Sequence, residues 1–165
     1  MSENPNLKDT IQLLVMDVDG TLTDGKIYMG ENGELIKVFN VKDGFAIHDL
    51  LPMHNILPVI ITGRISRIVE NRAKELGVLN IYQGINDKLG LLKKITQDKN
   101  ISMKNIAYIG DDINDLECMK LCGIKGCPAD AAVEIKAISD FVSNKNGGDG
   151  AVREFIETII GIFRV

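Results

Sequence analysis

The amino-acid sequence predicts an α/β fold with a Rossmann-like, mainly parallel sheet and helices on both of its faces. Short apolar segments alternate with segments of helical periodicity, which is the pattern of βαβ units. The most polar turns follow directly after apolar segments, where open parallel sheets bind their ligands. The 165 residues suit one domain and no linker or repeat divides them, so we expect a single domain over residues 1–165, with 1–10 as a flexible tail.

Five segments have the length and apolar character of buried strands. They cover residues 11–16, 57–61, 78–82, 105–109 and 123–127. Five further segments carry apolar residues at helical spacing, and these cover residues 43–54, 64–76, 86–99, 113–121 and 150–163. Pro52 has no backbone N–H to donate, so we expect it to end or kink the first helix.

An insertion interrupts the alternation after the first strand. Residues 26–29 and 34–40 are strand-like, and the turn Gly30-Glu31-Asn32-Gly33 between them has the glycine and asparagine typical of a hairpin. We therefore expect a β-hairpin insertion over residues 24–41. Because it follows the first polar turn directly, we interpret it as a flap over that turn; the alternative is an extension of the sheet.

Composition and charge narrow the classes of function. The net charge is −4, so nucleic acid is not an expected partner. No apolar stretch approaches the length of about 20 residues that spans a bilayer, and the N-terminal segment MSENPNLKDT is polar. We expect a cytoplasmic protein without a membrane partner. The three cysteines, Cys118, Cys122 and Cys127, fit a reducing compartment, and we favour packing over zinc binding because no fourth ligand stands at a familiar spacing.

Two carboxylates follow the first strand, in the segment Asp17-Val18-Asp19-Gly20-Thr21. Alternate side chains of an extended chain share a face, and two like charges held together require a cation or a shared proton. The alternative interpretation is an Asx turn that ends the strand. A reaction centre would use the pair well, because an attacking carboxylate has to be ionised while a neighbouring acid holds a proton.

Polar side chains also follow the second and the fourth predicted strands. The carboxyl ends of parallel strands meet at one edge of a sheet, so we expect these side chains to lie beside the first pair. The second strand leads into Thr62, Gly63 and Arg64, and the fourth leads into Gly110, Asp111, Asp112, Asn114 and Asp115.

Four elements together form a recognisable series: DVDGTLT, ITGR, Lys88 and GDDIND, which span Asp17 to Asp115. This series resembles the haloacid dehalogenase superfamily of phosphatases. The resemblance implies that Asp17 is the nucleophile that takes the phosphoryl group as an aspartyl phosphate. It also implies that Asp19 protonates the leaving oxygen and then activates water.

A magnesium ion is implied as well, since a hard cation would let Asp17 and Asp111 face a phosphate dianion. By the resemblance its ligands are the carboxylates of Asp17 and Asp111 and the backbone carbonyl of Asp19. Asp112 or Asp115 would support these ligands from behind. For Asp115 the alternative is the stabilisation of a helix N-terminus.

The same resemblance assigns the binding of the phosphoryl oxygens to Thr62, the Gly63 backbone and Lys88. Lys93 and Lys94 stand nearby as alternatives to Lys88, which comes first in the superfamily's order. Arg64 is the expected ligand of a carboxylate on the substrate, because a guanidinium group can bind a carboxylate through two hydrogen bonds.

Neither gap between the motifs holds a cap domain, since only about 25 residues separate Thr62 from Lys88. With its hairpin and the stretches 37–47 and 147–154, the chain resembles the family of 3-deoxy-D-manno-octulosonate 8-phosphate phosphatases. Members of that family are homotetramers, so the resemblance implies a homotetramer that acts on a sugar acid phosphate. The alternatives are a phosphatase of nine-carbon keto acid 9-phosphates, such as 2-keto-3-deoxynononic acid or N-acylneuraminate 9-phosphate, and a receiver-type phosphoacceptor signalling domain.

Two further segments have alternative interpretations. Gly147, Gly148 and Gly150 precede the last predicted helix, where their backbone amides could meet an anion; the alternative is a mobile loop. Asp43 with Gly44 marks the start of a helix and could also contact the substrate.

Overall fold

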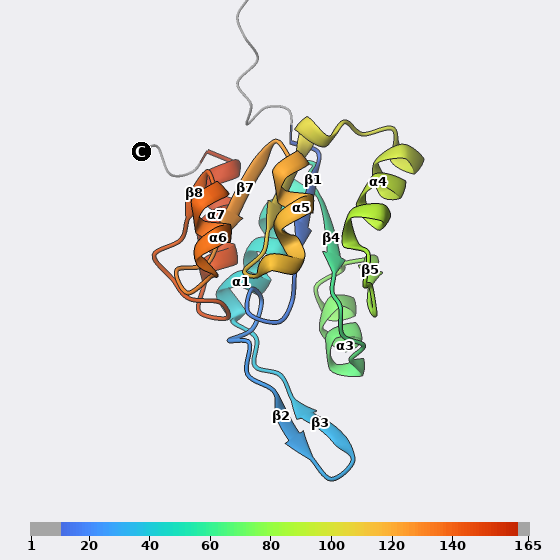
Figure 1. Cartoon of the computed structure of the whole chain (residues 1–165), viewed down its shortest axis with the longest axis vertical. Coiled ribbons are helices and arrows are strands. Elements are labelled where there is room, and N and C mark those ends of the chain that lie inside the picture. The colour runs from blue at the N-terminus through green and yellow to red at the C-terminus, as the bar shows by residue number, and fades with distance from the viewer. Residues whose placement is uncertain (1–10, 162–165) are drawn as a thin grey trace, which may run out of the picture.

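The computed structural model describes residues 11–161, so the tail expected for residues 1–10 lies outside the described residues. A six-stranded sheet in the order β5-β4-β1-β6-β7-β8 forms the centre, and each neighbouring pair is parallel (Figure 1). The predicted parallel sheet is therefore confirmed. Its strands are β1 (Leu13–Met16), β4 (Leu57–Ile61), β5 (Asn80–Tyr82), β6 (Ile106–Ile109), β7 (Ile124–Cys127) and β8 (Phe141–Val142).

Helices cover both faces of this sheet, as predicted. Along β1 the side chains of Leu14 and Met16 pack into one hydrophobic core and those of Leu13 and Val15 into a second, because alternate residues of a strand point to opposite faces. The first core lies under α1 (Val41–Phe45), the π-helical turn η2 (Ala46–Leu50), α2 (Leu51–Met53), α3 (Arg67–Glu75) and α7 (Ala151–Ile159). The second lies under α4 (Lys88–Lys99), α5 (Ile113–Leu121) and α6 (Val133–Ile138), and the short η3 (Met103–Asn105) precedes β6.

The first predicted helix, 43–54, differs in its course from a regular α-helix. It begins at Val41, where the side chain of Asn40 accepts a hydrogen bond from the backbone N–H of Lys42. The turn η2 widens directly before Pro52, and the helix ends at Met53. The prediction that Pro52 ends or kinks the helix is confirmed.

The short elements η3, α6 and β8 were not predicted. Strand β8 has two residues and helix α6 has six, too few to show a strand or helix period in the sequence. The last predicted helix, 150–163, is α7, which ends at Ile159; positions 162–163 of that prediction lie outside the described residues.

The insertion after β1 is a β-hairpin, formed by β2 (Tyr28–Gly30) and β3 (Gly33–Ile36). Gly33 has a φ of +111°, a backbone conformation that favours glycine. The two strands form a sheet of their own and project away from the main sheet beyond the turn that follows β1 (Figure 1). No cap domain accompanies the hairpin within the described residues.

The three cysteines are buried free thiols in the second core, as the packing interpretation predicted. Burial raises the pKa of Cys118 and Cys122 to about 12. Within residues 11–161, no helix combines the length and the apolar composition that crossing a membrane requires.

Candidate active site

A polar pocket lies at the carboxyl ends of the neighbouring strands β1, β4 and β6. This is the edge at which parallel sheets bind ligands. The turns after these three strands supply its lining. The lining residues are Asp17, Asp19, Thr62, Gly63, Arg64, Asp111, Asp112 and Asn114.

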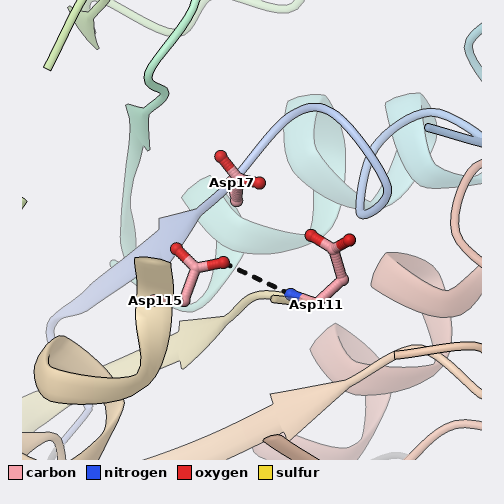
Figure 2. Close-up of side chains that lie close together, drawn as sticks. All are labelled: Asp17, Asp111 and Asp115. Atoms are coloured by element: carbon pink, nitrogen blue, oxygen red, sulfur yellow. Dashed lines mark hydrogen bonds between the residues drawn. The ribbon is translucent and has the colours of Figure 1, made fainter. Parts of the chain in front are cut away.

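Three carboxylates meet beside the pocket: Asp17, Asp111 and Asp115 each offer an oxygen within 4.8 Å of the others (Figure 2). Burial and the charge of Asp115 raise the pKa of Asp17 to about 6. Burial and the charge of Asp17 raise the pKa of Asp111 to about 8. Three carboxylates that repel one another in this way suit a divalent cation with oxygen ligands.

Lys88 lies between two of these carboxylates. Its Nζ is 2.8 Å from Oδ1 of Asp17 and 2.8 Å from Oδ1 of Asp115, and its side chain is 3% exposed. Although burial lowers the pKa of Lys88, the charges of Asp115 and Asp17 raise it above its ordinary value, so the ammonium stays charged. The alternative lysines, Lys93 and Lys94, are exposed on α4.

Asp115 connects several groups and is completely buried. Its Oδ1 accepts a hydrogen bond from the Tyr108 hydroxyl at 2.7 Å as well as from Lys88, and its Oδ2 accepts one from the Asp111 backbone N–H at 3.3 Å. Asp115 therefore contacts both Lys88 and Asp111 and holds them in position. This goes beyond the alternative role of stabilising the first turn of α5. Asp112 is exposed and caps α5, with its side chain accepting from the Ile113 N–H.

The turn after β1 holds Asp111 from the other side. Gly20 has a φ of +91°, and a Cβ at this position would lie 2.0 Å from Oδ2 of Asp111, so a larger residue would displace that carboxylate. The Thr21 hydroxyl donates to Oδ1 of Asp111 at 3.1 Å. In the Asp-Gly-Thr sequence, the glycine is thus needed for steric reasons and the threonine for its hydrogen bond to Asp111.

Asp19 is half-buried and pairs with Lys37, which follows the hairpin. The Lys37 Nζ also lies 2.7 Å from Oε1 of Glu34 on β3, and its side chain is 1% exposed. Sequence reasoning missed Glu34 and Lys37 as members of the site. The sequence placed Lys37 in the stretch of family resemblance, but where the hairpin would bring its side chain depends on the tertiary fold.

The turn after β4 contributes Thr62 and Arg64. Thr62 is 2% exposed, whereas the Arg64 side chain is 47% exposed at the mouth of the pocket, with Nη2 3.9 Å from Oε1 of Glu34. Asn114, which also lines the pocket, stands in the predicted GDDIND segment but had been given no role. The structure thus brings all the predicted site residues to one edge of the sheet.

The fold and the site are those of one class of enzyme, and comparison of the sequence with known families identifies that class. The family model of haloacid dehalogenase-like hydrolases matches residues 61–156. That segment includes the turns after β4 and β6 and the lysine of α4. The layout differs from the receiver alternative, in which the acceptor carboxylate follows a middle strand, because here the pair Asp17 and Asp19 follows β1, the first strand of the chain.

Individual relatives narrow the class further. A 3-deoxy-D-manno-octulosonate 8-phosphate phosphatase of Salmonella typhi is 42% identical over 152 residues, which cover 92% of this chain and 80% of that protein. The crystal structure of the Moraxella catarrhalis phosphatase of the same name, in complex with magnesium, phosphate and KDO, has a TM-score of 0.89 and 41% identity and covers 94% of this chain and 88% of that one. The cobalt-bound Haemophilus influenzae phosphatase has a TM-score of 0.90, 34% identity and coverages of 94% and 91%. This chain belongs to the haloacid dehalogenase-like hydrolases and, within them, to the family of 3-deoxy-D-manno-octulosonate 8-phosphate phosphatases.

Proposed function

We propose that this protein is a magnesium-dependent phosphatase that hydrolyses 3-deoxy-D-manno-octulosonate 8-phosphate to the free sugar acid and phosphate through an aspartyl phosphate. The observation that carries the proposal is the buried cluster of Asp17, Asp111, Asp115 and Lys88 at the carboxyl edge of the sheet. Relatives that carry the name of this activity align with the chain over most of their own length.

In the proposed reaction a carboxylate oxygen of Asp17 attacks the phosphorus atom. The ester bond to the sugar breaks as Asp19 gives its proton to the leaving oxygen, and Asp19 then takes a proton from the water that cleaves the aspartyl phosphate. The double ion pair of Lys37 supports this cycle. Because Glu34 also binds the ammonium at 2.7 Å, Lys37 keeps a partner while Asp19 carries the proton.

The donor set fits a magnesium ion. Asp17 and Asp111 present oxygens close together. Burial and the charge of Asp115 raise the pKa of Asp17, and burial and the charge of Asp17 raise the pKa of Asp111, so a cation would relieve the repulsion. Both oxygens of Asp115 already accept hydrogen bonds, so we assign the ion to Asp17, Asp111 and the Asp19 backbone carbonyl. When bound, magnesium supplies charge neutralisation for the phosphate dianion.

Thr62, the Gly63 backbone and Lys88 are proposed to hold the phosphoryl oxygens. Thr62 and Gly63 line the same pocket as Asp17 and Asp111, and Lys88 brings a buried positive charge to the attacking group. Negative charge spreads over the phosphoryl oxygens as the bond to the leaving group breaks, so fixed donors and cations stabilise the transition state.

Arg64 is the proposed ligand of the substrate carboxylate, because it is an exposed guanidinium at the mouth of the same pocket. The test compares kcat/KM on the eight-carbon and the nine-carbon keto acid phosphates, with a simple sugar phosphate as control. We expect the highest value on the eight-carbon substrate. A preference for a nine-carbon substrate would overturn the proposed specificity but leave the phosphatase chemistry intact.

We further propose a homotetramer in which hairpins associate. Apolar side chains are exposed on and beside the hairpin, and such patches are typical of protein interfaces. They are Ile27, Met29, Leu35, Ile36, Val38 and Val41. Light scattering of the active enzyme tests this, and a monodisperse, fully active monomer would contradict it.

We also propose a cytoplasmic location and a single domain. Three buried free thiols support a reducing, cytoplasmic location. The two cores on either side of one sheet support a single domain, with the hairpin as its insertion. Limited proteolysis that releases no stable fragment other than the full sheet would agree with a single domain.

A further inference from the structure

The glycine segment Gly147–Gly150 packs backbone to backbone against the turn after β1. A Cβ on Gly147 would lie 1.9 Å from the carbonyl oxygen of Gly20 and 2.8 Å from that of Thr23. The Gly148 N–H donates to the Thr21 carbonyl at 3.1 Å. Contacts this close leave no room for a side chain at position 147.

The turn that this segment touches is the one that holds Asp111. Gly20 fits against the Asp111 carboxylate, and the Thr21 hydroxyl donates to it. A shift of the turn would therefore move this carboxylate relative to Asp17. The glycine segment thus packs against the far side of the turn that contacts Asp111, a residue of the proposed magnesium site.

Two carboxylates anchor the segment. Asp130 accepts a hydrogen bond from the Gly147 N–H at 2.9 Å, and Asp43 accepts one from the Arg153 N–H at 2.7 Å in the first turn of α7. Asp130 lies in the loop after β7, in which the Ala132 N–H donates to the Asp111 carbonyl at 2.8 Å. The first carboxylate therefore ties the start of the segment to a loop that contacts Asp111, and the second holds the first turn of the helix that follows the segment.

These contacts argue against both interpretations of the glycines. The N-terminus of α7 already binds an anion, the buried carboxylate of Asp43. Arg153 pairs with Glu157 and lies over the ring of Phe45. The segment is consequently neither a mobile loop nor an open anion site.

We propose that Gly147–Gly150 is a backbone clamp that fixes Asp111 relative to Asp17 and so sets the magnesium affinity of the site. This inference rests on the proposed function, which assigns the ion to these two carboxylates. The residues of the clamp touch neither ion nor substrate and act by position. Groups behind metal ligands commonly matter in this way, because a carboxylate displaced by a fraction of an ångström binds its ion less well.

The test is Gly147→Ala, with Gly123→Ala as the matched control. A Cβ on Gly123 would lie 2.0 Å from the Lys104 carbonyl oxygen, an equally severe backbone contact. Gly123, however, precedes β7 at the amino ends of the strands, away from the site at their carboxyl ends. Calorimetric titration of the metal-free proteins with Mg²⁺ should show an affinity about 10–100-fold lower for Gly147→Ala than for wild type. Gly123→Ala should lose stability in urea and keep the wild-type affinity.

The outcomes separate the clamp from the function on which it rests. Wild-type affinity in folded Gly147→Ala, or an equal loss in Gly123→Ala, overturns the clamp alone. A wild-type protein that binds no Mg²⁺ overturns the proposed metal site and the clamp with it. If Gly147→Ala does not fold, Asp130→Asn is compared with Asp140→Asn, which removes the same charge from a hydrogen bond to the Lys125 N–H. The clamp then requires the larger loss of affinity in Asp130→Asn, and equal losses overturn it.

Discussion

The crowded carboxylates make the stability of the metal-free protein depend on pH in an unusual direction. The perturbation is removal of the metal with a chelator, followed by a titration from pH 4 to pH 8. Asp17 is 4% exposed, and its pKa rises from 3.8 to about 6 in the folded protein. At about 1.4 kcal/mol per pKa unit, this difference corresponds to about 3 kcal/mol.

The direction in which the free energy of unfolding changes with pH follows from proton binding. Between pH 4 and pH 6 the unfolded chain has released the proton of Asp17 while the folded protein keeps it, so the free energy of unfolding falls as the pH rises. The raised pKa of Asp111, about 8, extends the fall toward pH 8. Mg²⁺ should reverse it, because the ion binds the ionised carboxylates and gains affinity as they lose their protons.

The assay is urea unfolding at several pH values, with chelator and with saturating Mg²⁺. Asp111→Asn is the control variant: without metal it should be more stable than wild type at pH 8, because one repelling charge is gone, and Mg²⁺ should stabilise it little. The reasoning is refuted if the metal-free wild type gains stability between pH 4 and pH 8, or if Mg²⁺ stabilises it equally at both ends of this range.

Three substitutions test the assigned roles. Asp17→Asn should abolish turnover, measured as phosphate release, and metal-dependent turnover at the wild-type rate would exclude Asp17 as the nucleophile. Asp19→Asn should lose about 10²–10⁴-fold in kcat while calorimetry still detects Mg²⁺ binding, and wild-type activity would remove its acid role. Lys88→Met leaves two buried carboxylates without their counter-ion and should cost about 3–5 kcal/mol of stability in urea at neutral pH, together with activity; wild-type stability would show that the ion pairs contribute nothing.

The parts of the site that were predictable from sequence are those fixed by local structure. Asp17, Thr62 and Asp111 each follow an apolar strand, and parallel strands bring their carboxyl ends to one edge, so the proximity of these residues followed from the fold class. The core was predictable for the same reason, because strands buried on both faces are continuous apolar runs.

The contacts that escaped prediction join segments far apart in the chain. Lys37 meets Asp19 because the chain returns from the hairpin to the turn after β1, and Asp43 accepts a hydrogen bond from the N–H of Arg153, 110 positions later in the chain. An anion was one of the two alternatives for that helix, and the group that its first turn binds is the Asp43 carboxylate of the chain itself. No periodicity or propensity carries information about such pairings, since either partner alone is an ordinary surface residue type.

The separation of the hairpin from the main sheet has a consequence for how such enzymes diverge. In the described chain, β2 and β3 pair with each other and share no ladder with the six-stranded sheet. A longer, shorter or differently decorated hairpin would therefore leave the backbone hydrogen bonds of the main sheet in place, and one that keeps Glu34 and Lys37 would also keep the ion pairs with Asp19. The hairpin is in this sense an exchangeable module, and grafting hairpins between relatives would test whether it affects substrate preference.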